Sequence, residues 1–235
     1  MPKHLCLSLC LLAAGSVFGA DPTPKEAVTA AANKLGDAAD YSWKTVVAVP
    51  EEARFKPGPT EGKANKEGYA LFVMSFFDNK VEIAAKGDQR AVTDQSGEWK
   101  SAAEVGQEEG PGRFMAMIAR NLKTPVKEAA ELAGYVKDWK READVCSGEL
   151  TEEGAKTLQS FGPRGGDNGP SVSNAQGSVK FWVKDGSLLK YEFKLKGLIK
   201  FGDNEFPNDR TTTVEVKDVG TTKLEIPEAA RKKLS

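Results

Sequence analysis

The sequence predicts an α+β fold built on an antiparallel sheet. Much of the chain after residue 40 consists of short segments in which apolar and polar side chains alternate, the period of a half-buried strand. Gly, Asn and Asp residues separate these segments at the spacing of hairpin turns. Amphipathic helical stretches stand between two groups of strands, an order that fits α+β architecture.

The first 20 residues have the pattern of a secretory signal peptide. Lys3 and His4 precede an apolar run from residue 5 to about residue 14, and small residues follow. We therefore expect export to the periplasm or another extracellular space, with a single domain over residues 21–235. A small residue should precede a lipidated cysteine, whereas Leu9 precedes Cys10, so lipidation is not expected.

Composition excludes several classes of function. Loss of the leader removes Lys3 from the 33 basic residues, which leaves 32 against 34 acidic residues and a net charge of about −2. This near neutrality argues against a nucleic acid partner. No later segment approaches the ~20 apolar residues that span a membrane. His4, the single histidine, leaves with the leader, so we expect no metal, no cofactor and no enzymatic activity.

The first elements follow from capping signals and hydrophobic period. Thr23-Pro24-Lys25-Glu26 combines a capping residue with a first-turn proline and glutamate, so a helix should begin there and run to about Leu35. From Tyr41 the period changes to two, which predicts a strand to Val49. An almost continuously apolar strand is expected over residues 69–77. A meander should follow, with strands at 81–86, 90–93 and 98–100.

A helical insert is expected at about residues 113–142. Phe114, Met117, Ile118 and Leu122 lie at i, i+3, i+4 and i+8, which is one face of a helix, and a second amphipathic helix should begin after Thr124-Pro125. The sheet is the apolar surface on which both helices can lie. The remaining chain predicts a short helix capped at residue 151 and strands at 145–150, 172–183, 188–200, 211–219 and 224–226.

The stretch GSVKFWVKDGSLLKYEFKLKG, residues 177–197, predicts a long hairpin. A two-residue Asp-Gly turn would pair Phe181 with Lys190 and place apolar and charged side chains on one face. We therefore expect a three-residue loop with Gly186 as a left-handed bulge, which pairs Phe181 with Leu189 and gathers the apolar residues on one face. Lys180 would then lie opposite Lys190 on the wet face.

Three stretches resemble one known family. They are CSGELTEEGAKTL at 146–158, the hairpin at 177–197 and KDVGTTKLEIPEAARKKL at 217–234. They resemble the LolA/LppX/LprG/RseB-like half-barrel family of bacterial exported lipoprotein carriers and sensors. Chains of that family often have a strand ending in Leu-Thr, a tryptophan-bearing hairpin turned by Asp-Gly and a late strand closing on Ile-Pro. The resemblance implies a strongly curved antiparallel sheet, helices packed on its concave face and an apolar ligand between them.

Other candidate sites have ordinary structural interpretations. Cys146 has no histidine to activate it and is expected to be a buried strand residue. The glycine-rich loop at 162–170 lacks the phosphate-loop motif. The Asp-Asn pairs at 167–168 and 203–204 fit turns better than calcium ligands. Glu152 and Glu153 point about 100° apart on a helix, so we expect them to stabilise its N-terminus and not to cleave a glycoside.

A set of apolar side chains is the candidate binding surface. Its members come from the predicted strands and the helical insert: Trp43, Phe72, Phe76, Met117, Ile118, Leu122, Phe181, Tyr191 and Phe193. On packing grounds alone they fill a core without a cavity. With the resemblance, they line a site for a lipid or acyl chain in a non-catalytic binding protein. An envelope sensor or scaffold that binds another protein is the alternative, and a carboxylate-based hydrolase lacks any recognised catalytic spacing.

Overall fold

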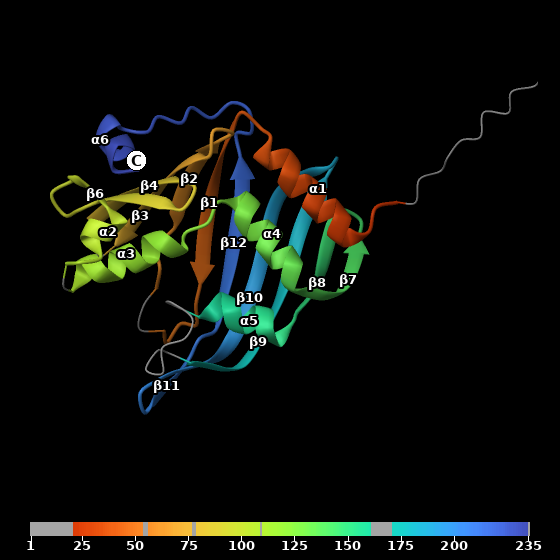
Figure 1. The fold of residues 1–235 in the computed structure, drawn as a ribbon. Helices are drawn as coiled ribbons and strands as arrows, with labels where there is room; N and C mark the ends of the chain where they lie inside the picture. Colours follow the sequence, from red (N-terminus) through yellow and green to blue (C-terminus); the bar gives the residue numbers. More distant parts are fainter. Residues whose placement is uncertain (1–20, 54–55, 77–78, 109, 161–170, 235) are drawn as a thin grey trace, which may run out of the picture.

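The structure is a computed structural model that describes residues 21–53, 56–76, 79–108, 110–160 and 171–234. The predicted leader and the predicted loop at 162–170 lie outside this part of the chain. The described residues form one open sheet of twelve antiparallel strands with helices around it (Figure 1). The predicted fold class, a curved antiparallel sheet with helices on its concave face, is confirmed.

The strands run in the order β6-β5-β4-β3-β2-β1-β12-β10-β9-β8-β7, and β11 pairs with the end of β10. Their bounds are β1 Asp40–Ala48, β2 Thr60–Asn65, β3 Tyr69–Phe76, β4 Asn79–Lys86, β5 Gln89–Thr93, β6 Trp99–Ser101, β7 Val136–Glu142, β8 Val145–Leu150, β9 Ser171–Lys184, β10 Ser187–Phe201, β11 Asn204–Pro207 and β12 Arg210–Lys217. The first six strands form a meander, and the β1–β12 ladder joins it to the second half of the sheet.

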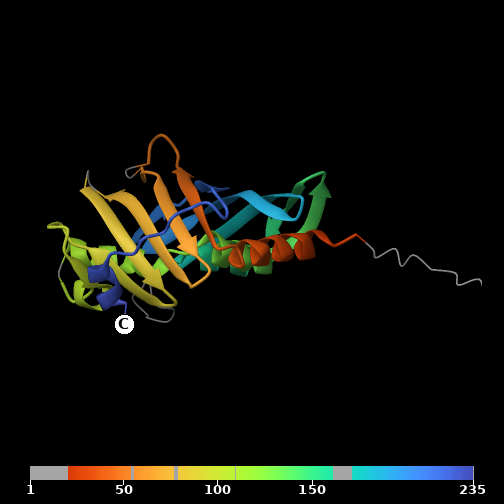
Figure 2. The same ribbon diagram turned by 90° about the horizontal axis from the view of Figure 1, so that it is seen from above.

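The helices are α1 Pro24–Gly36, α2 Ala102–Val105, α3 Pro111–Asn121, α4 Pro125–Tyr135, α5 Glu152–Gln159 and α6 Glu228–Lys233. Figures 1 and 2 show α1, α4 and α5 in front of the β7–β12 half, and α2 and α3 beside the β3–β6 half. The concave layer is therefore split into two groups of helices. The connection at 122–124 links α3 of one group to α4 of the other.

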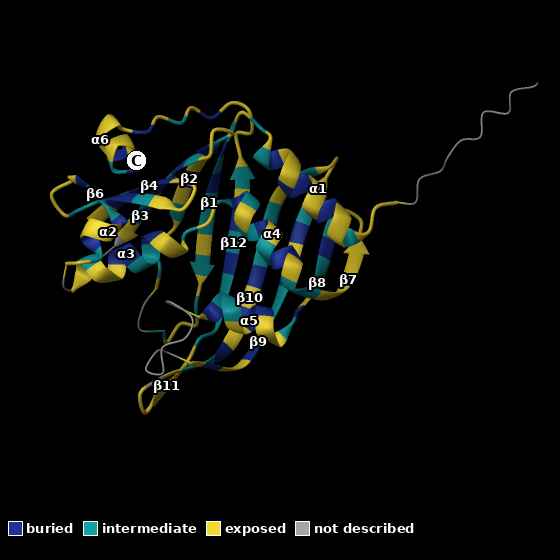
Figure 3. Cartoon of the chain, in the orientation of Figure 1, coloured by how far each residue is buried: buried dark blue, intermediate teal, exposed yellow. Residues whose placement is uncertain are grey.

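Small apolar residues let α1 lie close to the sheet. Thr23 and Glu26 form the predicted capping box, in which the Thr23 side chain accepts from the Glu26 amide at 3.3 Å. The inward face carries Ala27, Val28, Ala31, Ala32 and Leu35, all buried. Figure 3 shows the consequence for the helices in general: their buried faces turn toward the sheet and their exposed faces turn to solvent.

Several elements differ from the sequence prediction. β2 was not predicted, because TEGKAN lacks apolar alternation; it is a strand because it pairs with both β1 and β3. The helical insert ends earlier than predicted, at Tyr135, because residues 136–142 pair with β8 as the polar edge strand β7. The predicted strand at 224–226 is wrong: the segment crosses the outer face of the sheet without a ladder and leads to α6.

The outer, convex face carries a second, smaller core. Ile226, Ala230 and Leu234 from the C-terminal segment pack there with Ala84 and Trp99 of the sheet. Figure 2 shows this C-terminal segment passing over the strands of the first half before it reaches α6. The C-terminal segment and α6 thus cover the convex face of β4–β6, whereas helices α1, α4 and α5 cover the concave side.

The predicted register of the 177–197 hairpin is wrong. The turn is the two-residue Asp185-Gly186 type, with φ of 51° and 68°. A bulge lies between Leu188 and Lys190, so Leu188 turns inward and Leu189 is left 46% exposed. This bulge shifts the ladder by one residue after the turn and keeps the apolar residues on one face.

The corrected register removes the expected lysine repulsion. Phe181 lies opposite Tyr191, and Lys180 lies opposite Glu192 in place of Lys190. The ammonium group of Lys190 instead lies 4.8 Å from the centre of the Trp182 ring, a cation–π distance.

Candidate functional site

One row of residues crosses the concave face of the first half of the sheet. Cross-strand pairing aligns Val216, Trp43, Gly62, Phe72 and Ile83 on five successive strands. Gly62 provides the space in this row: a Cβ added there would lie 2.1 Å from Cζ2 of Trp43. The indole therefore lies flat over β2, and the absence of a side chain on Gly62 is what lets it do so.

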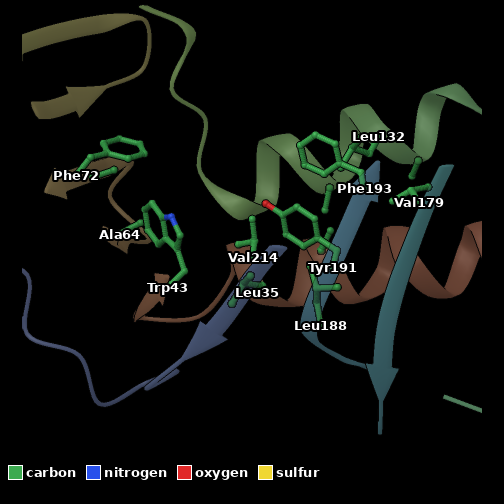
Figure 4. Packing of buried hydrophobic residues seen from close by; sticks show 14 of the residues in the cluster. Leu35, Trp43, Ala64, Phe72, Leu132, Val179, Leu188, Tyr191, Phe193 and Val214 are labelled. Atoms are coloured by element: carbon green, nitrogen blue, oxygen red, sulfur yellow. The ribbon is translucent and has the colours of Figure 1, made fainter. Parts of the chain in front are cut away.

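An aromatic cluster forms around this indole. The ring centres of Trp43 and Phe72 lie 5.3 Å apart in an edge-on arrangement, and those of Tyr41 and Trp43 lie 5.6 Å apart. Trp43 and Phe72 are 3% and 2% exposed. Figure 4 shows these two side chains on one side of the chain that leads into α4, and the Tyr191 side chain on the other.

The remaining predicted site residues divide between this cluster and the packing under α4. Phe181, Tyr191 and Phe193 are buried beneath α1 and α4, where the ring centres of Phe181 and Tyr191 lie 6.1 Å apart. Ile118 and Leu122 are partly buried against the same core. Phe76 belongs to β3, and its side chain lies outside the described part of the structure.

The predicted apolar stripe on α3 is rotated in the structure. Met115, Ala116 and Ala119 form the buried face, Met117 is only half-buried and Phe114 is 44% exposed. The sequence prediction was based on the large apolar residues of this helix and passed over the small ones between them. The alanines pack inward because they bring the helix backbone close to the sheet.

A small recess opens beside the aromatic cluster. Its volume is about 180 Å³, and its apolar walls are Tyr41, Ala64, Ala70, Phe72, Leu122 and Val126. These residues come from β1–β3, the connection at 122–124 and the start of α4. The recess therefore lies at the place where the two groups of helices part. Of the predicted site residues, Phe72 and Leu122 line it; Tyr41, Val126 and the alanines were not predicted.

A buried hydrogen bond borders this region. The Tyr191 hydroxyl donates to Oε2 of Glu128 at 2.6 Å. Although part of the Glu128 side chain reaches the surface, its carboxyl group is buried, and this burial raises the pKa of Glu128. Burial also raises the pKa of Tyr191 well above its ordinary value. Burial raises the pKa of Tyr41 to about 12, against the opposing effect of a hydrogen bond with Thr124.

Arg90 fastens α3 and the connection to the sheet. Its Nε donates to the carbonyl of Ala119 at 3.1 Å, and its Nη2 donates to the carbonyl of Leu122 at 3.4 Å. Its Nη1 donates to the carbonyls of Gly87 and Gln89. One partly buried guanidinium thus holds the end of α3 against the β4–β5 turn, and burial lowers its pKa.

A larger groove lies on the convex face. It measures about 830 Å³ and lies between the outer side of β1, β2 and β12 and the C-terminal segment that crosses them. Its wall mixes the acids Glu61, Asp218 and Glu225 with lysines, and Lys63 donates to the carbonyl of Lys223 at 3.3 Å. This groove has the mixed charge of an ordinary protein surface.

The alternative sites predicted to be structural behave in that way where they are described. Cys146 is 1% exposed, and burial raises the pKa of its thiol. Glu152 and Glu153 occupy the first turn of α5, where the Thr151 side chain accepts from the Gly154 amide. Among the described residues, no group of three potential ligands is placed to hold a metal ion. None of the described helices combines the length and the apolar character of a membrane span.

Comparisons with known proteins find similarity at the level of structure. No protein-family model and no curated protein matches the sequence. The lipoprotein LppX of Mycobacterium tuberculosis has a similar structure, with 10% sequence identity and a TM-score of 0.47. The match covers 87% of this chain and 99% of the LppX chain. LprF from Mycobacterium bovis has 10% sequence identity and a TM-score of 0.43, and the match covers 88% of this chain and 97% of the LprF chain. A LolA superfamily protein from Nitrosomonas europaea has 12% sequence identity and a TM-score of 0.39, and the match covers 92% of this chain and 98% of that protein's chain.

Proposed function

We propose that this chain is an exported, non-catalytic protein that binds an apolar ligand, a lipid or an acyl chain, between its curved sheet and its helices. The observation that carries this proposal is the recess beside Tyr41 and Phe72, where the helix layer divides and apolar walls meet solvent. Export is proposed from the leader pattern of residues 1–20.

The size of the recess sets a condition on binding. Ligand sites usually measure about 300–1,000 Å³, whereas this one measures about 180 Å³. An acyl chain would therefore enter fully only if the connection at 122–124 and α3 moved away from the sheet. Arg90 is the tether that such a movement must release, because it binds the carbonyls of Ala119 and Leu122. Each Å² of apolar surface then buried would contribute about 25 cal/mol.

The experiment that tests the proposal is organic extraction of the natively purified protein, followed by mass spectrometry. A lipid or fatty acid present in stoichiometric amount is expected. Leu122→Asp places a charge in the recess wall and should abolish the bound lipid. Val219→Asp is the matched control, because Val219 is 51% exposed outside the recess. A folded wild-type protein that carries no lipid, and takes none up from detergent-free vesicles, would contradict the proposal.

A second candidate is an envelope sensor or scaffold that binds another protein. The dense packing under α1 and α4 favours it, because Phe181, Tyr191 and Leu195 are fully buried without any ligand. Capture of one stoichiometric partner by delipidated protein, with Leu122→Asp binding that partner as well as the wild type, would support this candidate over lipid binding.

A further inference from the structure

The charged residues that line the recess are all basic. Its lining includes Lys66, Arg90 and Lys127 and no carboxylate. The whole chain has 33 basic and 34 acidic residues, so a site with three cations and no acid departs from the average surface. The larger convex groove shows the contrast, because both acids and lysines line it.

Two of the three cations are available to a ligand. The guanidinium of Arg90 is occupied by four backbone carbonyls, and Asp88 acts on its charge. Lys66 lies in the turn between β2 and β3, and Lys127 lies in the first turn of α4; both are exposed. Among the residues that the structure describes, neither lysine forms an ion pair.

The start of α4 adds to the positive electrostatic potential at the recess. Pro125 is the first helical residue, and the Thr124 side chain does not cap the amides of the first turn; the acid of that turn, Glu128, accepts from the Tyr191 hydroxyl. The positive end of the helix dipole therefore faces the side of the recess that Val126 and Lys127 line. Lys127 and this helix end act from α4, while Lys66 acts from the sheet, so positive charge flanks the apolar floor from both layers.

We propose that the ligand is an anionic amphiphile. Its apolar chain lies on the floor formed by Tyr41 and Phe72, and its carboxylate or phosphate group lies at the rim between Lys66 and Lys127. This inference rests on the proposed function and adds the charge of the ligand to it. Two exposed charge pairs together give a preference of roughly tenfold over a neutral chain of the same length.

Calorimetric titration of the delipidated protein at pH 8 tests the proposal with three probes of equal chain length: decanoate, decyl phosphate and 1-decanol. We expect both anions, or one of them, to bind about tenfold more tightly than decanol. The tighter anion identifies carboxylate or phosphate as the group recognised. The double variant Lys66→Gln/Lys127→Gln should lose this preference and keep the affinity for decanol, and surface changes of this kind leave stability almost unchanged.

Lys137→Gln/Lys184→Gln is the matched control. It removes the same charge from exposed positions on β7 and β9, in the other half of the sheet, and should bind like the wild type. Equal affinity of the wild type for the anions and for decanol would overturn the anionic inference and leave apolar binding intact. An equal loss of the preference for anions in both double variants would have the same meaning. Absence of binding by all three probes to folded protein would overturn the proposed function as well.

Discussion

The Tyr191 hydroxyl on β10 donates a 2.6 Å hydrogen bond to Oε2 of Glu128 on α4. This bond is a polar contact between that helix and the sheet. Lys123, Glu131, Arg210 and Tyr41 also act electrostatically on the pair. Because burial raises the pKa of Glu128, the folded protein holds a proton on this carboxyl more tightly than the unfolded chain does.

The first prediction concerns the pH dependence of stability. As pH rises from the ordinary value of 4.5 through the raised pKa, the folded protein binds more protons than the unfolded chain, so Glu128 lowers stability progressively. Glu128→Gln keeps an acceptor for Tyr191 and removes the titration. The stability of the variant relative to wild type should therefore increase with pH over this window, as measured by urea unfolding at successive pH values. A difference independent of pH would contradict the raised pKa.

The second prediction concerns Gly62. An alanine Cβ there would overlap the Trp43 indole, so Gly62→Ala should displace the ring and cost about 1–3 kcal/mol of unfolding free energy. Thermal unfolding and the tryptophan emission spectrum measure the two effects. Gly134→Ala is the control in α4: its Cβ would meet no atom within 4 Å, and it should stabilise by about 0.5–1 kcal/mol. Equal behaviour of the two variants would refute the close approach.

The third prediction separates the observed hairpin register from the one expected from the sequence. Leu188 is 3% exposed and Leu189 is 46% exposed. Leu188→Ala should cost about 2–4 kcal/mol, and Leu189→Ala should change stability by less than about 0.5 kcal/mol. Chemical denaturation of the two variants measures both values. A larger loss of stability in Leu189→Ala than in Leu188→Ala would support the three-residue loop instead.

The fourth prediction concerns the tether at Arg90. Arg90→Met removes the donors to Ala119 and Leu122, so amides at the end of α3 should exchange with deuterium about tenfold faster. Exchange in the middle of α4 should stay the same. Arg113→Met, an exposed change on α3 itself, is the control. Faster exchange throughout the protein would mean that Arg90 supports the whole fold and not this helix alone.

The fifth prediction concerns the thiol of Cys146. Its burial and raised pKa should make it unreactive toward Ellman's reagent in the native state, with reaction only at the rate of unfolding. The measurement uses the chain that begins at residue 21, since residues 1–20, the proposed leader, contain two further cysteines. Labelling within seconds under native conditions would show that β8 opens locally.

The sequence predicted elements whose own residues carry the signal. The capping box at Thr23 and the alternation after Tyr41 are local, and the structure has α1 and β1 there. β2 has no such signal, because its place depends on pairing with both neighbours and on the indole above Gly62. β7 was read as helix because Val136 continues the stripe of α4; only pairing with β8 makes it a strand.

The candidate site was predictable only in part. Trp43 and Phe72 are large and fall on the inward period of their strands, so they were named from the sequence. Lys66 and Lys127 look like ordinary surface lysines, separated by 61 positions in the chain, and only the fold brings both to one recess. The bulge after Leu188 was missed because two adjacent leucines give no sign of which one points inward.

The ladder between β1 and β12 also has a consequence for how the chain folds. Trp43 pairs with Val216, which the ribosome adds 173 residues later. The meander of β1–β6 can assemble from local contacts, but its β1 side stays an unpaired edge until nearly the whole polypeptide exists. A nascent or truncated chain that ends before residue 210 therefore presents an open strand to its neighbours, and such molecules should be the ones that aggregate or engage chaperones during biogenesis.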